Sequence, residues 1–156
     1  MDTAIVIGAS TGIGRATALA LADTYNNIAI TSFRHTDELM SLQHELESKG
    51  CHCLAMCGDA GDMEFMKTFI HRVSDTFGND IRLLVNNAGI SYVGLLTDMS
   101  SEDFDRTMKS NIYSVFNSCN LVVPYMVHSH RGRIINISSV WGSVGASCEV
   151  AYSASK

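Results

Sequence analysis

The sequence predicts an α/β fold in which helices cover both faces of one doubly wound parallel sheet. Short apolar runs alternate with longer helical patterns along the whole 156 residues. Runs such as 81–85 and 134–137 are continuously apolar, which is typical of strands covered on both faces. We therefore expect one domain over residues 1–156, with strand order 3-2-1-4-5 and a ligand crevice at the carboxyl ends of the strands.

Five strands and five helices account for nearly all of the chain. The strand patterns cover 3–7, 27–32, 51–57, 81–86 and 132–138. The helical patterns cover 12–24, 36–49, 61–77 and 101–129, and a last helix begins near 150. No repeat, low-complexity stretch or linker interrupts this alternation.

Composition supports a folded domain and argues against two classes of partner. Hydrophobic residues make up 46% of the chain, charged residues 17%, and there is a single proline. The net charge of −5, with no cluster of Lys and Arg, argues against nucleic-acid binding. No apolar stretch approaches a membrane span, and no basic-then-apolar leader precedes the first strand. We expect a cytoplasmic protein without a membrane partner.

The cysteines and histidines do not form a metal-binding pattern. None of the five cysteines shows C-x-x-C or zinc spacing, and the six histidines are scattered. Free thiols and no metal site are therefore expected. Cys51, Cys53 and Cys57 share the parity of one strand face, so we expect them to be small buried hydrophobes.

Glycines are concentrated where the first strand meets the first helix, in the spacing G-x-x-x-G-x-G. Glycine lets the backbone turn tightly, and the helix N-terminus offers free N–H groups and a positive dipole end to a phosphate. A plain strand-to-helix turn is the alternative, but the strand–turn–helix context favours nucleotide binding. The residues expected at this turn are Gly8, Ser10, Thr11, Gly12, Ile13 and Gly14.

The ends of the other strands also carry polar residues suited to a ligand. Because parallel strands end at one edge of the sheet, these residues should gather in the same crevice. They are Ser32 and Arg34 after the second strand, Asp59 and Ala60 after the third, Asn87, Ala88 and Gly89 after the fourth, and Ser139 after the fifth.

Tyr152 and Lys156 stand four positions apart, on one face of the expected last helix. A fixed positive charge stabilises a phenolate, so a neighbouring ammonium makes a phenol a better proton donor near neutral pH. Ser139 lies thirteen positions before the tyrosine. The Tyr-x-x-x-Lys spacing alone is commonplace, and it gains weight from the glycine-rich turn.

With these motifs in order, the whole chain resembles the N-terminal part of a short-chain dehydrogenase/reductase, a family with a Rossmann-like fold. The glycine-rich turn, the segment Asn86–Gly89 and the helical Asn111 match that family's motifs, as do Ser139, Tyr152 and Lys156. The resemblance implies a carbonyl reductase whose catalytic residues are Asn111, Ser139, Tyr152 and Lys156.

In the reaction that this resemblance implies, Tyr152 protonates the carbonyl oxygen, Ser139 donates a hydrogen bond to it, and Asn111 holds a water in a proton relay. Tyr152 and Lys156 would also contact the cofactor, Lys156 at the nicotinamide ribose. For Asn111 the alternative is a satisfied polar group on a buried helix face.

The end of the second strand bears on the choice of cofactor. An acid there would bind a ribose 2′-hydroxyl and repel a 2′-phosphate, and none occurs before Asp37. Arg34 offers a planar fork suited to phosphate and Ser32 a hydroxyl, so NADP(H) is favoured over NAD(H). A solvated Arg34 is the alternative. Asp59 resembles the family's adenine-contacting position, or else serves as a turn or capping residue.

Two substrate classes remain open, both small-molecule or carrier-linked ketones. Within the family the chain most resembles reductases of the β-ketoacyl-acyl-carrier-protein type. The stretch 138–152 is also similar to the elongation factor P 5-aminopentanone reductases. In the second case Glu149 could pair with a substrate ammonium, whereas in the first it only favours the helix start.

Members of the family normally continue past the catalytic lysine through two more strands and a substrate-binding loop. The resemblance therefore implies a domain that is incomplete at its C-terminus, and a homo-oligomer in the complete form. The alternative to an enzyme is a truncated fragment that binds nucleotide weakly or not at all and catalyses nothing. In that case the fifth strand should be an unpaired sheet edge.

Overall fold

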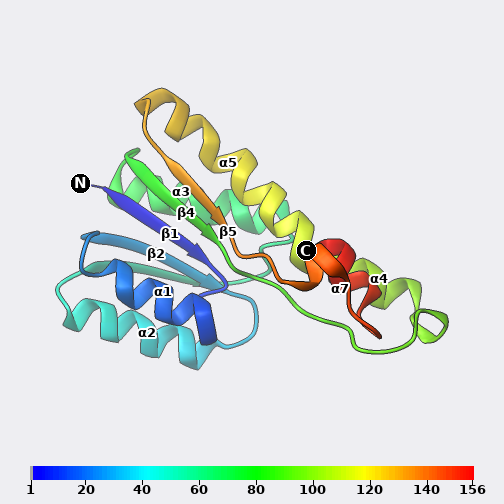
Figure 1. The fold of residues 1–156 in the computed structure, drawn as a ribbon. Coiled ribbons are helices and arrows are strands. Elements are labelled where there is room, and N and C mark those ends of the chain that lie inside the picture. The colour runs from blue at the N-terminus through cyan, green and yellow to red at the C-terminus, as the bar shows by residue number, and fades with distance from the viewer. Residues whose placement is uncertain (1) are drawn as a thin grey trace.

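The computed structural model describes residues 2–156 and contains one five-stranded parallel sheet (Figure 1). The strands are β1 (Thr3–Ile7), β2 (Asn27–Ser32), β3 (His52–Cys57), β4 (Ile81–Asn86) and β5 (Arg133–Asn136). Their order is β3-β2-β1-β4-β5, and all four pairings are parallel. The predicted fold class and strand order are confirmed, and the strand boundaries agree to within two residues.

Two helices cover each face of the sheet. On one face lie α1 (Gly12–Leu21) and α2 (Thr36–Ser48), and on the other lie α3 (Met63–Phe77) and α5 (Ser114–Ser129) (Figure 1). β1 is buried along its whole length between these layers. It therefore alternates its side chains between two cores, as expected for a central strand of a doubly wound sheet.

Each core combines alternate strand residues with one apolar helix stripe. On the first face Leu39, Leu42 and Leu46 of α2 pack with Val6 and Ile28. The spacing of these leucines, three and four residues apart, places them on one side of the helix. The second core is built around α3 and α5, and its members include Met66, Phe69, Val73, Val122, Ile5 and Leu84.

The outer strands are less buried than their apolar sequences predict. β3 and β5 form the two edges of the sheet in residues 2–156, and all of their residues are half-buried or exposed. The expectation of three buried cysteines is therefore wrong in part. Cys51 is buried and Cys53 is half-buried, but Cys57 is exposed. Burial raises the pKa of the Cys53 thiol to about 12. All five cysteines are free thiols.

The predicted helix 101–129 is interrupted. It consists of α4 (Ser101–Met108), a π-helical turn η2 (Lys109–Tyr113), hereafter the π turn, and α5. The backbone N–H of Ser114 donates to the carbonyl of Lys109, five residues earlier, which inserts one extra residue into the helix. Side-chain periodicity does not report this change, because apolar positions continue on both sides of it.

The remaining elements lie near the carboxyl end of the sheet. They are the 3-10 turn η1 (Leu96–Asp98), the short α6 (Trp141–Val144) and α7 (Val150–Ser155). η1 and α6 were not expected, whereas α7 begins where the last helix was predicted. α7 lies beside α4 and carries the chain's C-terminus (Figure 1).

Candidate functional site

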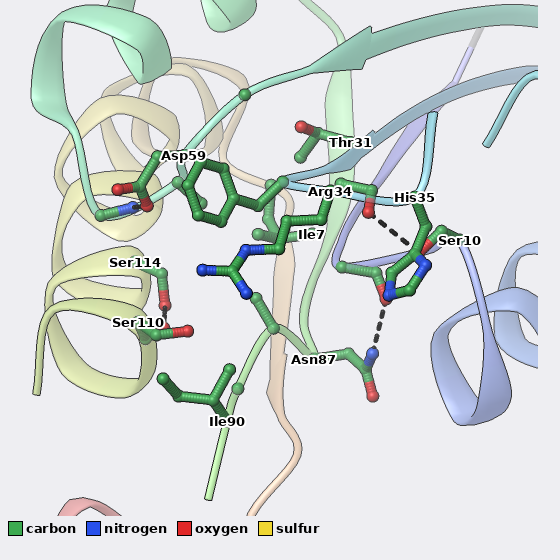
Figure 2. A pocket seen from close by; sticks show the side chains of 18 of the residues that line it. Ile7, Ser10, Thr31, Arg34, His35, Asp59, Asn87, Ile90, Ser110 and Ser114 are labelled. Carbon is green, nitrogen blue, oxygen red and sulfur yellow. Dashed lines mark hydrogen bonds between the residues drawn. The ribbon is translucent and has the colours of Figure 1, made fainter. Parts of the chain in front are cut away.

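A cavity of about 560 Å³ opens at the carboxyl ends of the strands. Its wall comes from the loops after β1, β2, β3 and β4 and from the junction of α4 with α5 (Figure 2). This volume lies in the range of roughly 300–1,000 Å³ that is usual for small-molecule pockets. Ten residues predicted to bind cofactor line it: Gly8, Ser10, Thr11, Ser32, Arg34, Asp59, Ala60, Asn87, Ala88 and Gly89.

Gly8 is the point at which the turn after β1 meets the segment after β4. It has a φ of +79°, and a Cβ atom there would lie 2.7 Å from the backbone nitrogen and Cα of Ala88. The Asn87 carboxamide donates a hydrogen bond of 2.7 Å to the Gly8 carbonyl. At Gly14 a Cβ would collide with that same carbonyl. Both glycines are therefore required by close approach of the backbone.

The helix after this turn begins without a side-chain cap. Thr11 occupies the N-cap position of α1 and makes no side-chain hydrogen bond to the first turn, which contains no acidic residue. The first N–H groups and the positive dipole end are therefore available to an anion, which fits a dinucleotide pyrophosphate. Gly12, Ile13 and Gly14 lie outside the cavity wall and form this first turn, where Ile13 is exposed.

The end of β2 brings Arg34 into the cavity. In Figure 2 its guanidinium extends into the middle of the pocket, and it lies 5.3 Å from the centre of the Phe33 ring. The buried hydroxyl of Ser32 donates to Ser10 Oγ at 2.9 Å, which joins this strand end to the glycine-rich turn. Arg34 is thus the cationic group that β2 presents to a ligand.

The end of β3 is held by a residue from the opposite wall. Asp59 Oδ1 accepts the backbone N–H of Gly61 at 2.8 Å, and Asp59 Oδ2 pairs with Lys109 Nζ at 2.9 Å. The hydrogen bond with Asp59 raises the pKa of Lys109 above its ordinary value. Asp59 therefore stabilises the turn after β3, which the sequence offered as one alternative, and it also forms an ion pair with the π turn.

Asn111 is buried, with 3% of its surface exposed, and all of its amide protons are used. Its Oδ1 accepts the backbone N–H of Ile90 at 2.8 Å, while Nδ2 donates to the Ile90 carbonyl at 2.9 Å and to Ser155 Oγ at 2.7 Å. The side chain thereby clamps the segment after β4 and joins it to α7.

Tyr152 and Lys156 lie together on the last helical turn of the chain. Lys156 Nζ is 5.8 Å from the centre of the Tyr152 ring and donates a hydrogen bond of 2.9 Å to the Ile137 carbonyl. Burial lowers the pKa of Lys156 below its ordinary value. An ammonium beside a phenol favours transfer of the phenolic proton.

Gly89 connects this pair to the cavity. A Cβ atom at Gly89 would lie 3.2 Å from Lys156 Nζ and 3.3 Å from Asn111 Oδ1. Gly89 itself lines the cavity, whereas Ser139, Tyr152, Lys156 and Asn111 lie outside its wall. Of the predicted catalytic residues, Lys156 and Asn111 therefore stand directly behind Gly89, and Tyr152 lies beside Lys156.

Ser139 begins the turn that leads into α6. Its Oγ accepts the backbone N–H of Trp141 at 3.2 Å. A hydroxyl that accepts in this way still has its proton to donate. The neighbouring Ser138 hydroxyl donates instead to the Lys156 carbonyl at 2.8 Å.

Glu149 lies directly before α7 and reaches the cavity wall. It is half-buried, and its Oε1 accepts the hydroxyl proton of Ser91 at 2.6 Å. The backbone N–H of Gly94 donates to the Cys148 carbonyl at 2.8 Å, which holds the same two loops together. Cys148 has a φ of +63°, an uncommon conformation for a non-glycine residue.

Sequence reasoning missed part of the cavity wall. The additional polar side chains that line it are those of Thr31, Ser91, Arg106, Lys109, Ser110 and Ser114. The residues from α4, the π turn and α5 reach the crevice because this helical segment crosses the carboxyl ends of the strands. The spacing of residues within the segment does not indicate that position.

Within residues 2–156, no group of three or more His, Cys, Asp or Glu side chains is placed to hold a metal ion. Within the same residues, every helix is too short or too polar to cross a lipid bilayer.

Residues 2–156 match the family model described as short chain dehydrogenase. The chain belongs to the short chain dehydrogenase family. This membership agrees with the strand order, with the glycine-rich turn and with the Tyr152–Lys156 pair on α7.

Several relatives align with almost the whole chain. It is 36% identical over 154 residues to the 3-oxoacyl-[acyl-carrier-protein] reductase FabG of Staphylococcus aureus. That alignment covers 99% of this chain and 62% of the relative. It is 34% identical over 154 residues to the protein of the same description from Staphylococcus epidermidis, with 99% and 63% covered. The oxidoreductase UcpA of Salmonella typhimurium is 37% identical over 155 residues, with 99% and 58% covered. The chain thus spans about three fifths of the length of these relatives.

Proposed function

We propose that this protein is an NADPH-dependent carbonyl reductase that acts on a ketone. The observation that carries the proposal is the corner at Gly89, where the crevice at the carboxyl ends of the strands meets Lys156 and, through it, Tyr152. We take Tyr152, with the Lys156 ammonium beside it, as the proton donor for a cofactor and substrate bound in this crevice.

A reduced nicotinamide, when bound, supplies the hydride for reduction of a carbonyl carbon. The residues of this chain then manage the proton and the charge. Tyr152 would donate its phenolic proton to the carbonyl oxygen, and Lys156 would stabilise the phenolate that remains. The Ser139 hydroxyl would donate a hydrogen bond to the same oxygen while negative charge develops there.

Asn111 would act from behind this group. Its amide protons are already given to Ile90 and Ser155, so the remaining acceptor capacity lies on Oδ1. We propose that a water in the proton relay binds there or at the Asn111 backbone. The clamp on Ile90 and Ser155 would hold that acceptor in place.

The cofactor would lie with its pyrophosphate at the first turn of α1. Its adenosine would lie toward Asp59 and Ala60, and its nicotinamide ribose toward Asn87–Gly89, Tyr152 and Lys156. The preference for NADP(H) is supported by Arg34, which extends into the pocket from a strand end that carries no acid. The Ser10 hydroxyl, which accepts from Ser32, keeps its own proton for a phosphate oxygen.

A 3-oxoacyl thioester on an acyl carrier protein is the substrate that we favour. The support is the identity of 36% over 99% of this chain to a relative described as a 3-oxoacyl-[acyl-carrier-protein] reductase. Reduction would convert the 3-oxo group into a 3-hydroxyl group, while the thioester stays intact.

A second candidate is reduction of an amine-bearing ketone, as in a 5-aminopentanone modification on elongation factor P. The half-buried carboxylate of Glu149 favours it, because this negative charge stands one helical turn before Tyr152 and contacts the cavity wall through Ser91. A carboxylate in that position can pair with a substrate ammonium.

Tyr152→Phe tests the proposal in the full-length protein. Only the transferable proton is lost, so we expect turnover of an acetoacetyl thioester with NADPH to fall by roughly 10²–10⁴-fold. Binding of NADP⁺, followed by titration calorimetry, should stay close to that of the unmodified protein. Tyr25→Phe, at the opposite end of the sheet, is the matched control and should retain ordinary turnover. Near-ordinary turnover of Tyr152→Phe would contradict the assignment.

A further inference from the structure

Lys109 joins the loop after β3 to the helical segment that carries Asn111. Its ammonium lies 2.9 Å from Asp59 Oδ2, and the other oxygen of that carboxylate is fixed by the Gly61 N–H at 2.8 Å. Asp59, Gly61 and Lys109 all line the same cavity. The family motifs in the sequence assign no role to Lys109.

The backbone of the loop also packs directly on Lys109. A Cβ atom at Gly61 would lie 2.6 Å from the Lys109 carbonyl oxygen and 2.7 Å from Lys109 Cγ. That carbonyl is the acceptor of the Ser114 N–H, the hydrogen bond of i to i+5 type that closes the π turn. The loop therefore abuts the atom on which the π turn depends.

The opposite side of the π turn presents Asn111. Its carboxamide holds both the N–H and the carbonyl of Ile90 and donates to Ser155 on α7. A continuous line of contacts thus runs from Asp59, toward which the adenosine is proposed to lie, through Lys109, to Asn111. From there it reaches the helix that carries Tyr152 and Lys156.

The segment that forms the π turn has one simple alternative conformation, the uninterrupted α-helix that the sequence pattern predicts. In an α-helix successive residues are about 100° apart around the axis, so loss of the extra residue would rotate one side of the segment by about that angle. Asn111 could not then keep its contacts with both Ile90 and Ser155. Segments with two such discrete arrangements are suited to carry coupling between sites.

We propose that Lys109 is a positioning residue. Its contacts with Asp59 and Gly61 hold the π turn in register, and the π turn holds Asn111 against the segment after β4. Because Lys109 and Asp59 are about 49% and 26% exposed at their side chains, the ion pair alone is weak. The packing of Gly61 on the Lys109 backbone supplies the second, short-range part of the contact.

Hydrogen exchange of the Ile90 amide measures this directly by NMR, since that N–H donates to Asn111 Oδ1. In the ligand-free protein, Lys109→Met should make this amide exchange about two- to fivefold faster, the factor that a partly exposed ion pair allows. Gly61→Ala, which keeps both charges but forces the loop away, should have an effect in the same direction. Lys109→Arg can still pair with Asp59 and should restore most of the protection.

Lys67→Met is the matched control, because Lys67 forms a similar ion pair of 2.7 Å with Glu64 on the outer side of α3. In the Lys67→Met variant the Ile90 amide should exchange as fast as in the unmodified protein. The inference is overturned if Lys109→Met and Lys67→Met exchange alike at Ile90, or if Lys109→Arg is as fast as Lys109→Met.

An arm with NADP⁺ extends the test and rests on the proposed function. NADP⁺ should slow exchange at Ile90 in the unmodified protein, and less so in Lys109→Met, if the contact transmits occupancy of the adenosine end. If NADP⁺ protects no amide of the crevice, the proposed cofactor is contradicted. The ligand-free comparison still decides the role of Lys109, since it requires neither cofactor nor turnover.

Discussion

The Asn87 carboxamide donates a hydrogen bond of 2.7 Å to the carbonyl of Gly8, a residue 79 positions earlier in the chain. It thereby fastens the segment after β4 to the turn after β1, where the backbones already approach closely at Ala88. The two halves of the crevice are thus joined at the place where a pyrophosphate would lie. Substitutions at this contact should affect both folding and cofactor binding.

Gly8→Ala should destabilise the protein more than Gly50→Ala does. Both glycines have positive φ, +79° and +90°, but a Cβ at Gly8 collides with Ala88, whereas the space around Gly50 is open. The left-handed conformation alone costs an alanine roughly 1–2 kcal/mol, which is the loss expected for Gly50→Ala. The collision should add about 1–3 kcal/mol for Gly8→Ala.

Urea unfolding of both variants measures the difference, and calorimetry with NADP⁺ measures the effect on the crevice. Gly50→Ala should bind NADP⁺ as the unmodified protein does. Equal losses of stability in the two variants would show that the approach of Gly8 to Ala88 is not tight in solution.

Arg34→Asp should move cofactor preference from NADP(H) toward NAD(H). The guanidinium in the pocket can pair with a 2′-phosphate, whereas a carboxylate there repels the phosphate and accepts from a ribose hydroxyl. A charge-assisted contact of this kind contributes about 1.5–3 kcal/mol, so the ratio of the two affinities should change by at least about tenfold. Dissociation constants for NADP⁺ and NAD⁺ in both proteins provide the measurement.

Arg15→Met is a suitable control, because Arg15 of α1 pairs with Glu45 of α2 and does not line the cavity. It should leave the ratio unchanged. A protein that binds NAD⁺ better than NADP⁺ before any substitution would remove the case for a 2′-phosphate site at Arg34.

The sequence was sufficient for the sheet and for much of the wall of the cavity at its carboxyl end. Parallel strands end at one edge, so the residues after each apolar run could be collected without knowing any contact. The exposure of Cys57 could also have been predicted from the sequence, because the predicted strand order already placed its strand at the edge of the sheet. Parity identifies the face of a strand but does not say whether a helix covers that face.

The π turn and the Asp59–Lys109 pair could not be predicted in the same way. A π turn is defined by which carbonyl accepts the Ser114 N–H, and the apolar pattern is the same for either choice. Asp59 and Lys109 are 50 positions apart, and neither position alone indicates the other. Such contacts depend on how α4 crosses the end of the sheet.

Raising the pH should lower activity and raise stability over the same interval through Lys156. Burial lowers the pKa of this ammonium, so it loses its proton below the range of an ordinary lysine. The neutral amine no longer stabilises the Tyr152 phenolate, and turnover should fall. In that interval the unfolded chain binds more protons than the folded one, so the free energy of unfolding should increase with pH.

Lys156→Met and Lys156→Arg separate the two effects. Relative to Lys156→Met, the unmodified protein should gain stability in urea as the pH rises between the lowered and the ordinary lysine value. In Lys156→Arg the guanidinium stays charged, so any remaining turnover should persist to higher pH. An alkaline limb at the same pH in the unmodified protein and in Lys156→Arg would exclude Lys156 as its origin.

Glu149→Gln distinguishes the two substrate candidates. The carboxamide oxygen of glutamine can still accept the Ser91 hydroxyl proton, so the contact of 2.6 Å between the two loops is kept while the charge is removed. If Glu149 pairs with a substrate ammonium, kcat/KM for an amine-bearing ketone should fall by about tenfold or more, since hydrogen bonds to charged groups contribute about 1.5–3 kcal/mol. The kcat/KM for an acetoacetyl thioester should change little, because that substrate presents no cation.

Ser91→Ala is the complementary variant: it removes the loop contact but keeps the charge, and it should affect both substrates alike. Equal loss on both substrates in Glu149→Gln would assign Glu149 to the start of α7 and leave the 3-oxoacyl thioester as the better-supported substrate.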